Sequence, residues 1–168
     1  MTHLSNFLRT SLLAKVILLT FVLAISSITV LAQTNRKAGG GALDDQPVFH
    51  EYRGVQLGWL ADEVRKKLGE PANKSDEQDY YVFAEKEVAQ ILYDKATKKV
   101  VTISVDFQTG ASGILTPQQV FGADIETKTD GSKYKLVRYP KAGYWISYSR
   151  TAGETPTVSV TITRIANQ

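Results

Sequence analysis

The chain has 168 residues, of which 43% are hydrophobic, 10% aromatic and 22% charged, and it contains no cysteine. This composition is ordinary for a globular protein and excludes collagen-like, coiled-coil and low-complexity disordered chains. The lack of cysteine excludes disulfides, thiolate metal sites, cysteine nucleophiles and acylated-cysteine lipid anchors. The formal net charge of +3 includes Arg9 and Lys15 in residues 1–32, which hold no acid. The remainder is therefore nearly neutral and gives no indication of a nucleic acid partner.

Residues 1–32 resemble an export signal in their order of properties. Arg9 and Lys15 precede an uncharged run over residues 16–32, which has a small-residue end. A basic start, an apolar centre and a small-residue end predict a secretory signal peptide, cleaved before Gln33. An uncleaved membrane anchor over residues 16–32 is the alternative, because its length is the lower limit for a span. Both place the rest of the chain outside the cytoplasm, in the periplasm or bound to the envelope. Only an uncleaved segment would then contact a membrane.

A polar segment separates this signal from the folded part. Residues 33–47 contain three consecutive glycines and show no hydrophobic periodicity, which predicts a flexible linker. Ordered structure is expected to begin near Val48, with a short strand within residues 48–55.

The first helix is predicted over residues 60–68. Leu60, Val64 and Leu68 recur at the spacing of one helical face and would form a single apolar stripe. Gly69 provides a C-terminal stop. The helix is therefore expected to pack against a sheet through this stripe.

Three strands are predicted after a polar loop over residues 73–78. They span residues 79–84, 88–93 and 99–107, with short polar connections that suit antiparallel hairpins. In the third run, Val, Ile and Phe alternate with Thr, Ser and Asp. One face of the sheet is thus expected to be buried and the other to meet water.

The same order returns in weaker form in the second half. Thr116 is expected to cap a short helix over residues 117–121. Three more strands are predicted, over residues 134–139, 144–149 and 157–164. We therefore predict an α+β fold of two tandem copies, residues 48–109 and 110–168, each a helix, a loop and three strands. The short helices would pack on one face of a single antiparallel sheet and leave the other face to water or a partner.

Two short motifs in the first copy match a known family. Leu57-Gly58 opens the first helical segment, and Leu68-Gly69-Glu70-Pro71 closes it. They resemble the opening motif of BamE/SmpA/OmlA-type domains, where a Leu-Gly-Met-Thr-like start leads into a helix closed by Leu-Gly-Lys-Pro. Trp59 stands in place of the usual Met, and the lipid-bearing cysteine of BamE proper is missing. The resemblance covers residues 54–107. It implies a scaffold role in outer-membrane assembly and, in tandem, a fold like that of the beta-lactamase-inhibitor protein.

Residues with catalytic or metal-binding chemistry are sparse. His50 lies beside Glu51 and near Asp44 and Asp45, which is the one grouping that could hold a metal or act in acid–base catalysis. No second histidine follows residue 32, and we interpret His50 as a surface residue. No nucleophile elbow or phosphate-binding loop is present. The sequence predicts neither an enzyme nor a cofactor.

Aromatic residues give the clearest indication of a binding surface. In the strand over residues 144–149, Trp145 alternates with residues that suit the core, which places it on the open face as a partner anchor. Packing of Trp145 within the protein is the alternative. Arg138 and Tyr139 are expected to border this patch. Tyr80 and Tyr81 occupy alternate faces of their strand, so one of them is expected to reach the open face in the first copy, and we predict Tyr81 as that contact residue. Trp59 is expected in the core.

These observations predict an exported, non-enzymatic module that binds a protein partner in the bacterial cell envelope, as a scaffold of the BamE type. An inhibitor of a secreted enzyme is a second hypothesis, suggested by the tandem copies. A small-ligand or metal-binding protein that uses His50 is a third.

Overall fold

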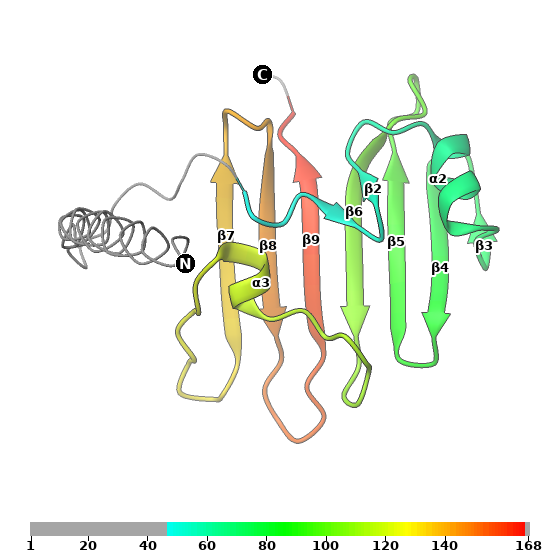
Figure 1. Ribbon diagram of the computed structural model, residues 1–168. Helices are drawn as coiled ribbons and strands as arrows, with labels where there is room; N and C mark the ends of the chain where they lie inside the picture. Colours follow the sequence, from blue (N-terminus) through cyan, green and yellow to red (C-terminus); the bar gives the residue numbers. More distant parts are fainter. Residues whose placement is uncertain (1–46, 167–168) are drawn as a thin grey trace, which may run out of the picture. The chain divides into compact units, whose positions relative to one another are not determined.

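The computed structural model describes residues 47–166, which form one antiparallel sheet with two short helices on one face (Figure 1). The predicted α+β architecture is confirmed at this level. The helices are α2 (Ala61–Leu68) and α3 (Pro117–Phe121), and a small hairpin of β1 (Glu51–Tyr52) and β2 (Val55–Gln56) precedes α2. The strands of the main sheet are β3 (Asn73–Lys74), β4 (Gln78–Ala84), β5 (Glu87–Tyr93), β6 (Val100–Phe107), β7 (Lys133–Tyr139), β8 (Tyr144–Arg150) and β9 (Val158–Arg164). The predicted leader and nearly all of the predicted linker lie outside the described residues.

The strands of the main sheet follow the order β3-β4-β5-β6-β9-β8-β7. Strands β4 to β6 form one meander and strands β7 to β9 form another, and the two meet where β6 pairs with β9. Helix α2 precedes the first meander and α3 precedes the second. All six predicted strands are present, with ends that shift by one residue at most. The agreement is clearest for β6 and β9, where apolar and polar side chains alternate along most of each strand.

Two segments near the start of the fold differ from expectation. The single strand expected within residues 48–55 is instead the β1–β2 hairpin. The chain reverses there because Arg53 and Gly54 both adopt positive φ, 51° and 79°, as a two-residue hairpin turn requires. The loop expected over residues 73–78 contains β3, which pairs with the first residues of β4.

Helix α2 packs through a slightly different stripe from the predicted one. Val64 is fully buried and Leu68 is half-buried, but Leu60 remains 44% exposed. Leu60 precedes the helix in an extended conformation, and its backbone N–H donates to the Glu63 carboxylate at 2.8 Å. Ala61 therefore takes the first position of the buried stripe, since it is the first residue with helical geometry.

Helix α3 has the ends that its sequence predicts. The Thr116 hydroxyl accepts a hydrogen bond from the Gln119 backbone N–H at 3.3 Å, and Pro117 begins the helix. Gly122 ends it in the left-handed conformation at φ 73°, which favours glycine because a Cβ would be strained there. This short helix buries Val120 and Phe121 over the second meander.

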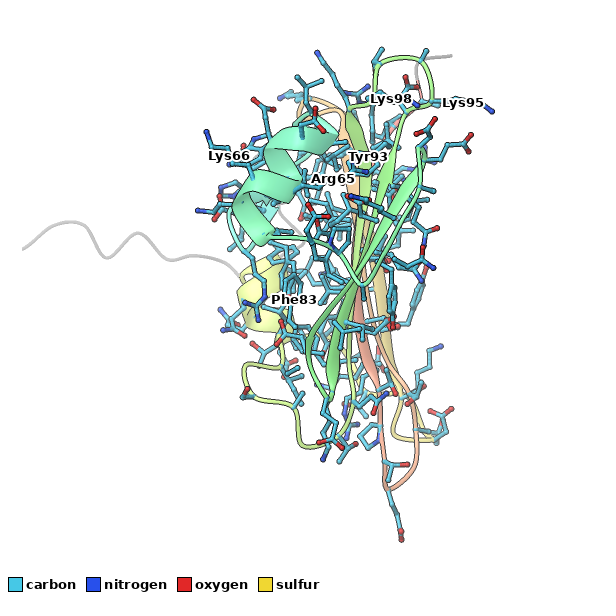
Figure 2. All side chains as sticks on the ribbon, turned by 90° about the vertical axis from the view of Figure 1, so that its right-hand side faces the viewer. Arg65, Lys66, Phe83, Tyr93, Lys95 and Lys98 are labelled. Atoms are coloured by element: carbon cyan, nitrogen blue, oxygen red, sulfur yellow. The ribbon has the colours of Figure 1, made fainter. Side chains whose placement is uncertain are left out.

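A row of aliphatic side chains crosses the covered face of the sheet. Ile91, Ile103, Ile162 and Ile146 are Cα partners from strand to strand along β5, β6, β9 and β8. Each is at most 1% exposed. Both helices lie on this side, and no helix of residues 47–166 lies on the other (Figure 2). The core is therefore one-sided, and the second face of the sheet is open.

Candidate functional site

The open face of the sheet is a regular array of three rows that cross six strands. Each row is a chain of Cα partners from β4 through β5, β6, β9 and β8 to β7. The rows are Gln78, Leu92, Thr102, Thr163, Trp145, Arg138; then Tyr80, Gln90, Ser104, Thr161, Ser147, Leu136; then Val82, Val88, Asp106, Ser159, Ser149, Tyr134. Because pairing is in register across the sheet, these side chains share one surface.

The centre of the open face is lined by hydroxyl groups that pair with one another. The hydroxyls of Thr102 and Thr163 lie 3.2 Å apart, and those of Ser104 and Thr161 lie 3.0 Å apart. The Ser159 hydroxyl donates to the Asp106 carboxylate at 2.5 Å. These pairs hold the side chains of β6 and β9 in fixed orientations, so the central strip is polar and ordered.

Apolar and aromatic side chains lie on both sides of this strip. The β7–β8 patch consists of Tyr134, Leu136, Arg138 and Trp145, and the β4–β5 patch consists of Tyr80, Val82, Val88 and Leu92. Tyr134 is 55% exposed, Leu136 43% and Val82 53%. Large apolar side chains that remain exposed together are a feature of interaction surfaces.

Two of the four residues predicted to contact a partner lie together in the β7–β8 patch. Arg138 and Trp145 are Cα partners on β7 and β8. Arg138 is exposed and Trp145 is half-buried. Their pairing brings a guanidinium group and an indole to neighbouring positions, a combination that is frequent at the energetic centres of protein interfaces.

The other two residues predicted to contact a partner, Tyr81 and Tyr139, do not lie on the open face. Tyr81 and Tyr139 belong to the covered face and are only 3% and 6% exposed. Alternation along β4 places Tyr80 and Tyr81 on opposite faces, and the packing of the neighbouring elements puts Tyr81 on the covered one. Tyr80 is therefore the open-face tyrosine of the first meander.

The sequence interpretation missed the exposed apolar residues of the two patches. Tyr134, Leu136 and Val82 lie in predicted strands, at positions whose side chains point to the open face. The detectable signal was an apolar residue at a position where the alternation predicts a polar one. The open-face residues of β7 are Tyr134, Leu136 and Arg138. Two large apolar or aromatic side chains are unusual on a face that meets only water.

Trp59 and His50 lie away from the open face. Trp59 is half-buried, packs against the core and borders a shallow cavity with Glu63, Lys66 and Lys67. His50 is exposed, and its Nδ1 lies 3.2 Å from the Val48 carbonyl oxygen. Among residues 47–166, no three His, Asp or Glu side chains are grouped to hold a metal ion.

The covered side contains two buried carboxylates, Asp79 and Glu87, that bind side chains of other elements. Asp79 is fully buried and accepts two hydrogen bonds from Arg65 at 2.9 Å each and one from the Tyr93 hydroxyl at 2.7 Å. Figure 2 shows Arg65 reaching from α2 toward Tyr93 on the sheet. Burial, followed by the hydrogen bond and charge of Asp79, raises the pKa of Tyr93. This network attaches α2 to the sheet.

The second buried carboxylate, Glu87 on β5, attaches the β1–β2 hairpin. It accepts hydrogen bonds from the Tyr52 hydroxyl and from Arg53, whose Nη2 lies 2.6 Å away. The Arg53 guanidinium also lies 4.2 Å from the centre of the Phe83 ring. Glu87 borders an open cavity of about 420 Å³, and its Oε1 receives the hydrogen bonds from both Tyr52 and Arg53, which indicates a structural role for that oxygen.

Comparisons with family models, with curated proteins and with solved structures find no match for this chain. In the part of the chain that the structure describes, none of the helices has the length and apolar character needed to cross a membrane.

Proposed function

We propose that this chain is an exported, non-enzymatic module that binds a protein partner in the bacterial cell envelope through the open face of its sheet. The observation that carries the proposal is the β7–β8 patch. Exposed Leu136 and Tyr134 adjoin Trp145 and Arg138 on a face that no helix of residues 47–166 covers. A rigid aromatic and apolar surface of this kind binds proteins at a low cost in side-chain entropy.

Export is part of the same proposal and is supported by the basic and then apolar order of residues 1–32. A scaffold role of the BamE type is supported by the motif residues Leu57-Gly58 and Leu68-Gly69-Glu70-Pro71. Gly58 and Gly69 both adopt positive φ, at 86° and 87°, at the two ends of the α2 segment. The motif thus has a conformational reason in this chain, since glycine is favoured at such positions.

The proposal is tested by replacing Trp145 with alanine. We expect affinity for the envelope partner to fall about thirtyfold, equivalent to about 2 kcal/mol, because Trp145 anchors the patch. The partner is first identified by affinity capture of the tagged protein from its native envelope. Binding is then measured with purified components by calorimetry.

A matched pair of leucine variants controls this experiment. Leu136→Ala removes an apolar side chain that is 43% exposed on the open face, and Leu60→Ala removes one that is 44% exposed beside α2. We expect only Leu136→Ala to weaken binding. Equal affinities for wild type, Trp145→Ala and Leu136→Ala would contradict the open-face proposal.

We also propose that the two meanders are tandem copies of one unit, and this favours a second candidate function. The support is the sheet order, in which β4-β5-β6 and β7-β8-β9 run inward from opposite edges, each after its own helix. Tandem copies suggest an inhibitor of a secreted enzyme. We expect such an inhibitor to slow the turnover of a beta-lactamase or a secreted peptidase, and Trp145→Ala to relieve that inhibition. An absence of inhibition across a panel of both classes would contradict this candidate.

A further inference from the structure

The outer edge of β7 has little pairing in the structure. Within residues 47–166, the outer side of β7 makes a single bridge, between Thr127 and its first residue Lys133. Figure 1 shows β7 as the last strand at its end of the sheet, with α3 on the helix-covered side. The backbone groups of residues 134–139 that point away from β8 therefore have no strand partner in the described part of the chain.

The two edges of the sheet differ in how they are protected. At the opposite edge, β3 pairs with Asp79 and Tyr80, and the register of β4 shifts between Val82 and Ala84. By contrast, β7 pairs with β8 in an unbroken register of seven residues. A regular edge without a bulge or internal proline is the kind that accepts an added strand.

The side chains along β7 define what kind of strand would fit. On the open face, Tyr134 and Leu136 expose apolar surface. On the helix-covered face, the Lys135 ammonium lies 5.0 Å from the centre of the Phe121 ring on α3. Lys133 is paired with Asp124 at 3.1 Å. Exposed Arg138 adds a further positive charge on the open face.

We propose that the outer edge of β7 binds an extended acidic segment of a protein partner as an added β-strand. Side chains of the added strand alternate between the two faces. Acidic residues of the segment lie beside Lys135 on the helix-covered face, and apolar residues lie beside Tyr134 and Leu136 on the open face. A second copy of this chain fits poorly, because pairing two β7 edges brings their basic side chains together.

This inference rests on the proposed function only in assigning a polypeptide ligand. It concerns backbone pairing at the edge, whereas the proposed function concerns side chains of the open face. Peptide binding at the edge is measured without the envelope partner, so a failure of one proposal is distinguishable from a failure of the other.

The probe is a fluorescently labelled peptide of β7 length that alternates Glu and Val. We expect the full chain to bind it, with affinity that falls as salt is added, and to slow amide hydrogen exchange across residues 134–139. Lys135→Glu is expected to weaken binding at least about fivefold through charge reversal. The matched control is Lys66→Glu on α2, which lies over the other end of the sheet and is expected to bind like wild type.

A peptide of the same composition with Glu and Val in separate blocks tests the alternation, and a peptide N-methylated along one edge tests backbone pairing. We expect neither to bind. Equal binding of these peptides, binding without exchange protection in β7, or no binding of the alternating peptide would each overturn the proposal.

Discussion

Replacing Arg65 by alanine is expected to lower the free energy of unfolding by about 3 kcal/mol, because it leaves a buried carboxylate without its cation. Asp79 is fully buried, and Arg65 supplies two of its hydrogen bonds. The hydroxyl of Tyr93 would remain as a donor but carries no positive charge. The loss is measured by urea denaturation, followed through the fluorescence of Trp59 and Trp145.

Lys66→Ala is the matched control for this prediction. Lys66 is the next residue of α2 and is exposed, so its removal is expected to change stability by less than about 0.5 kcal/mol. An Arg65→Ala protein as stable as Lys66→Ala would show that the Arg65–Asp79 pair does not attach α2 to the sheet. The open face should keep its structure in both variants, because the network lies on the covered side.

The protein is expected to lose stability steeply under alkaline conditions, through its buried tyrosines. Burial, and then the negative charge of Asp79, raises the pKa of Tyr81 to about 12, whereas an unfolded chain releases this proton near pH ~10. Below that pH both states are protonated and the stabilisation is complete. As the pH rises from about 10 to about 12, the unfolded state ionises first, and Tyr81 alone accounts for a loss of about 2 to 3 kcal/mol. Burial also raises the pKa of Tyr52 and Tyr93, so their contributions add to the same trend.

Tyr81→Phe isolates one part of this effect. The Tyr81 hydroxyl is buried and has no hydrogen-bond partner among the described residues. Its removal is therefore expected to change stability at neutral pH by no more than about 1 kcal/mol. The variant should lose less stability between pH ~9 and pH ~12 than wild type does, in urea denaturation series measured at each pH. Identical pH dependence in the two proteins would contradict the assignment to Tyr81.

The sequence by itself determined most of the secondary structure. The alternation in β6, where Ile103, Val105 and Phe107 face the core, is local and strong. The same holds for Thr116-Pro117 and Gly122 at the ends of α3, whose capping geometry depends on neighbouring residues only. Such signals do not depend on distant contacts. The positions of the six long strands and of both helices along the chain were therefore predictable.

The tertiary structure decided which faces carry which residues. Alternation places Tyr80 and Tyr81 on opposite faces, but only the pairing of β4 with β5 and the packing of α2 decide that Tyr81 is buried. Tyr139 is buried at the other end of the sheet, where it pairs with Tyr144 of β8 and the two rings lie 6.1 Å apart. Tyr80 and Tyr81 are the same residue type, so the free energy of burying the side chain is the same for both. Hydrophobicity alone therefore does not predict which of the two faces the core.

Long-range pairing decided the remainder of the candidate site. The pairing of β6 with β9 joins the two meanders into one surface, and it brings Asp106 to Ser159, more than fifty residues along the chain. The attachment of Arg65 to Asp79 and of Arg53 to Glu87 likewise depends on contacts between separate elements. The sequence does not distinguish a buried carboxylate from an exposed one. The free-energy cost of burying its charge is offset by a cation, and the fold brings that cation from a distant part of the chain.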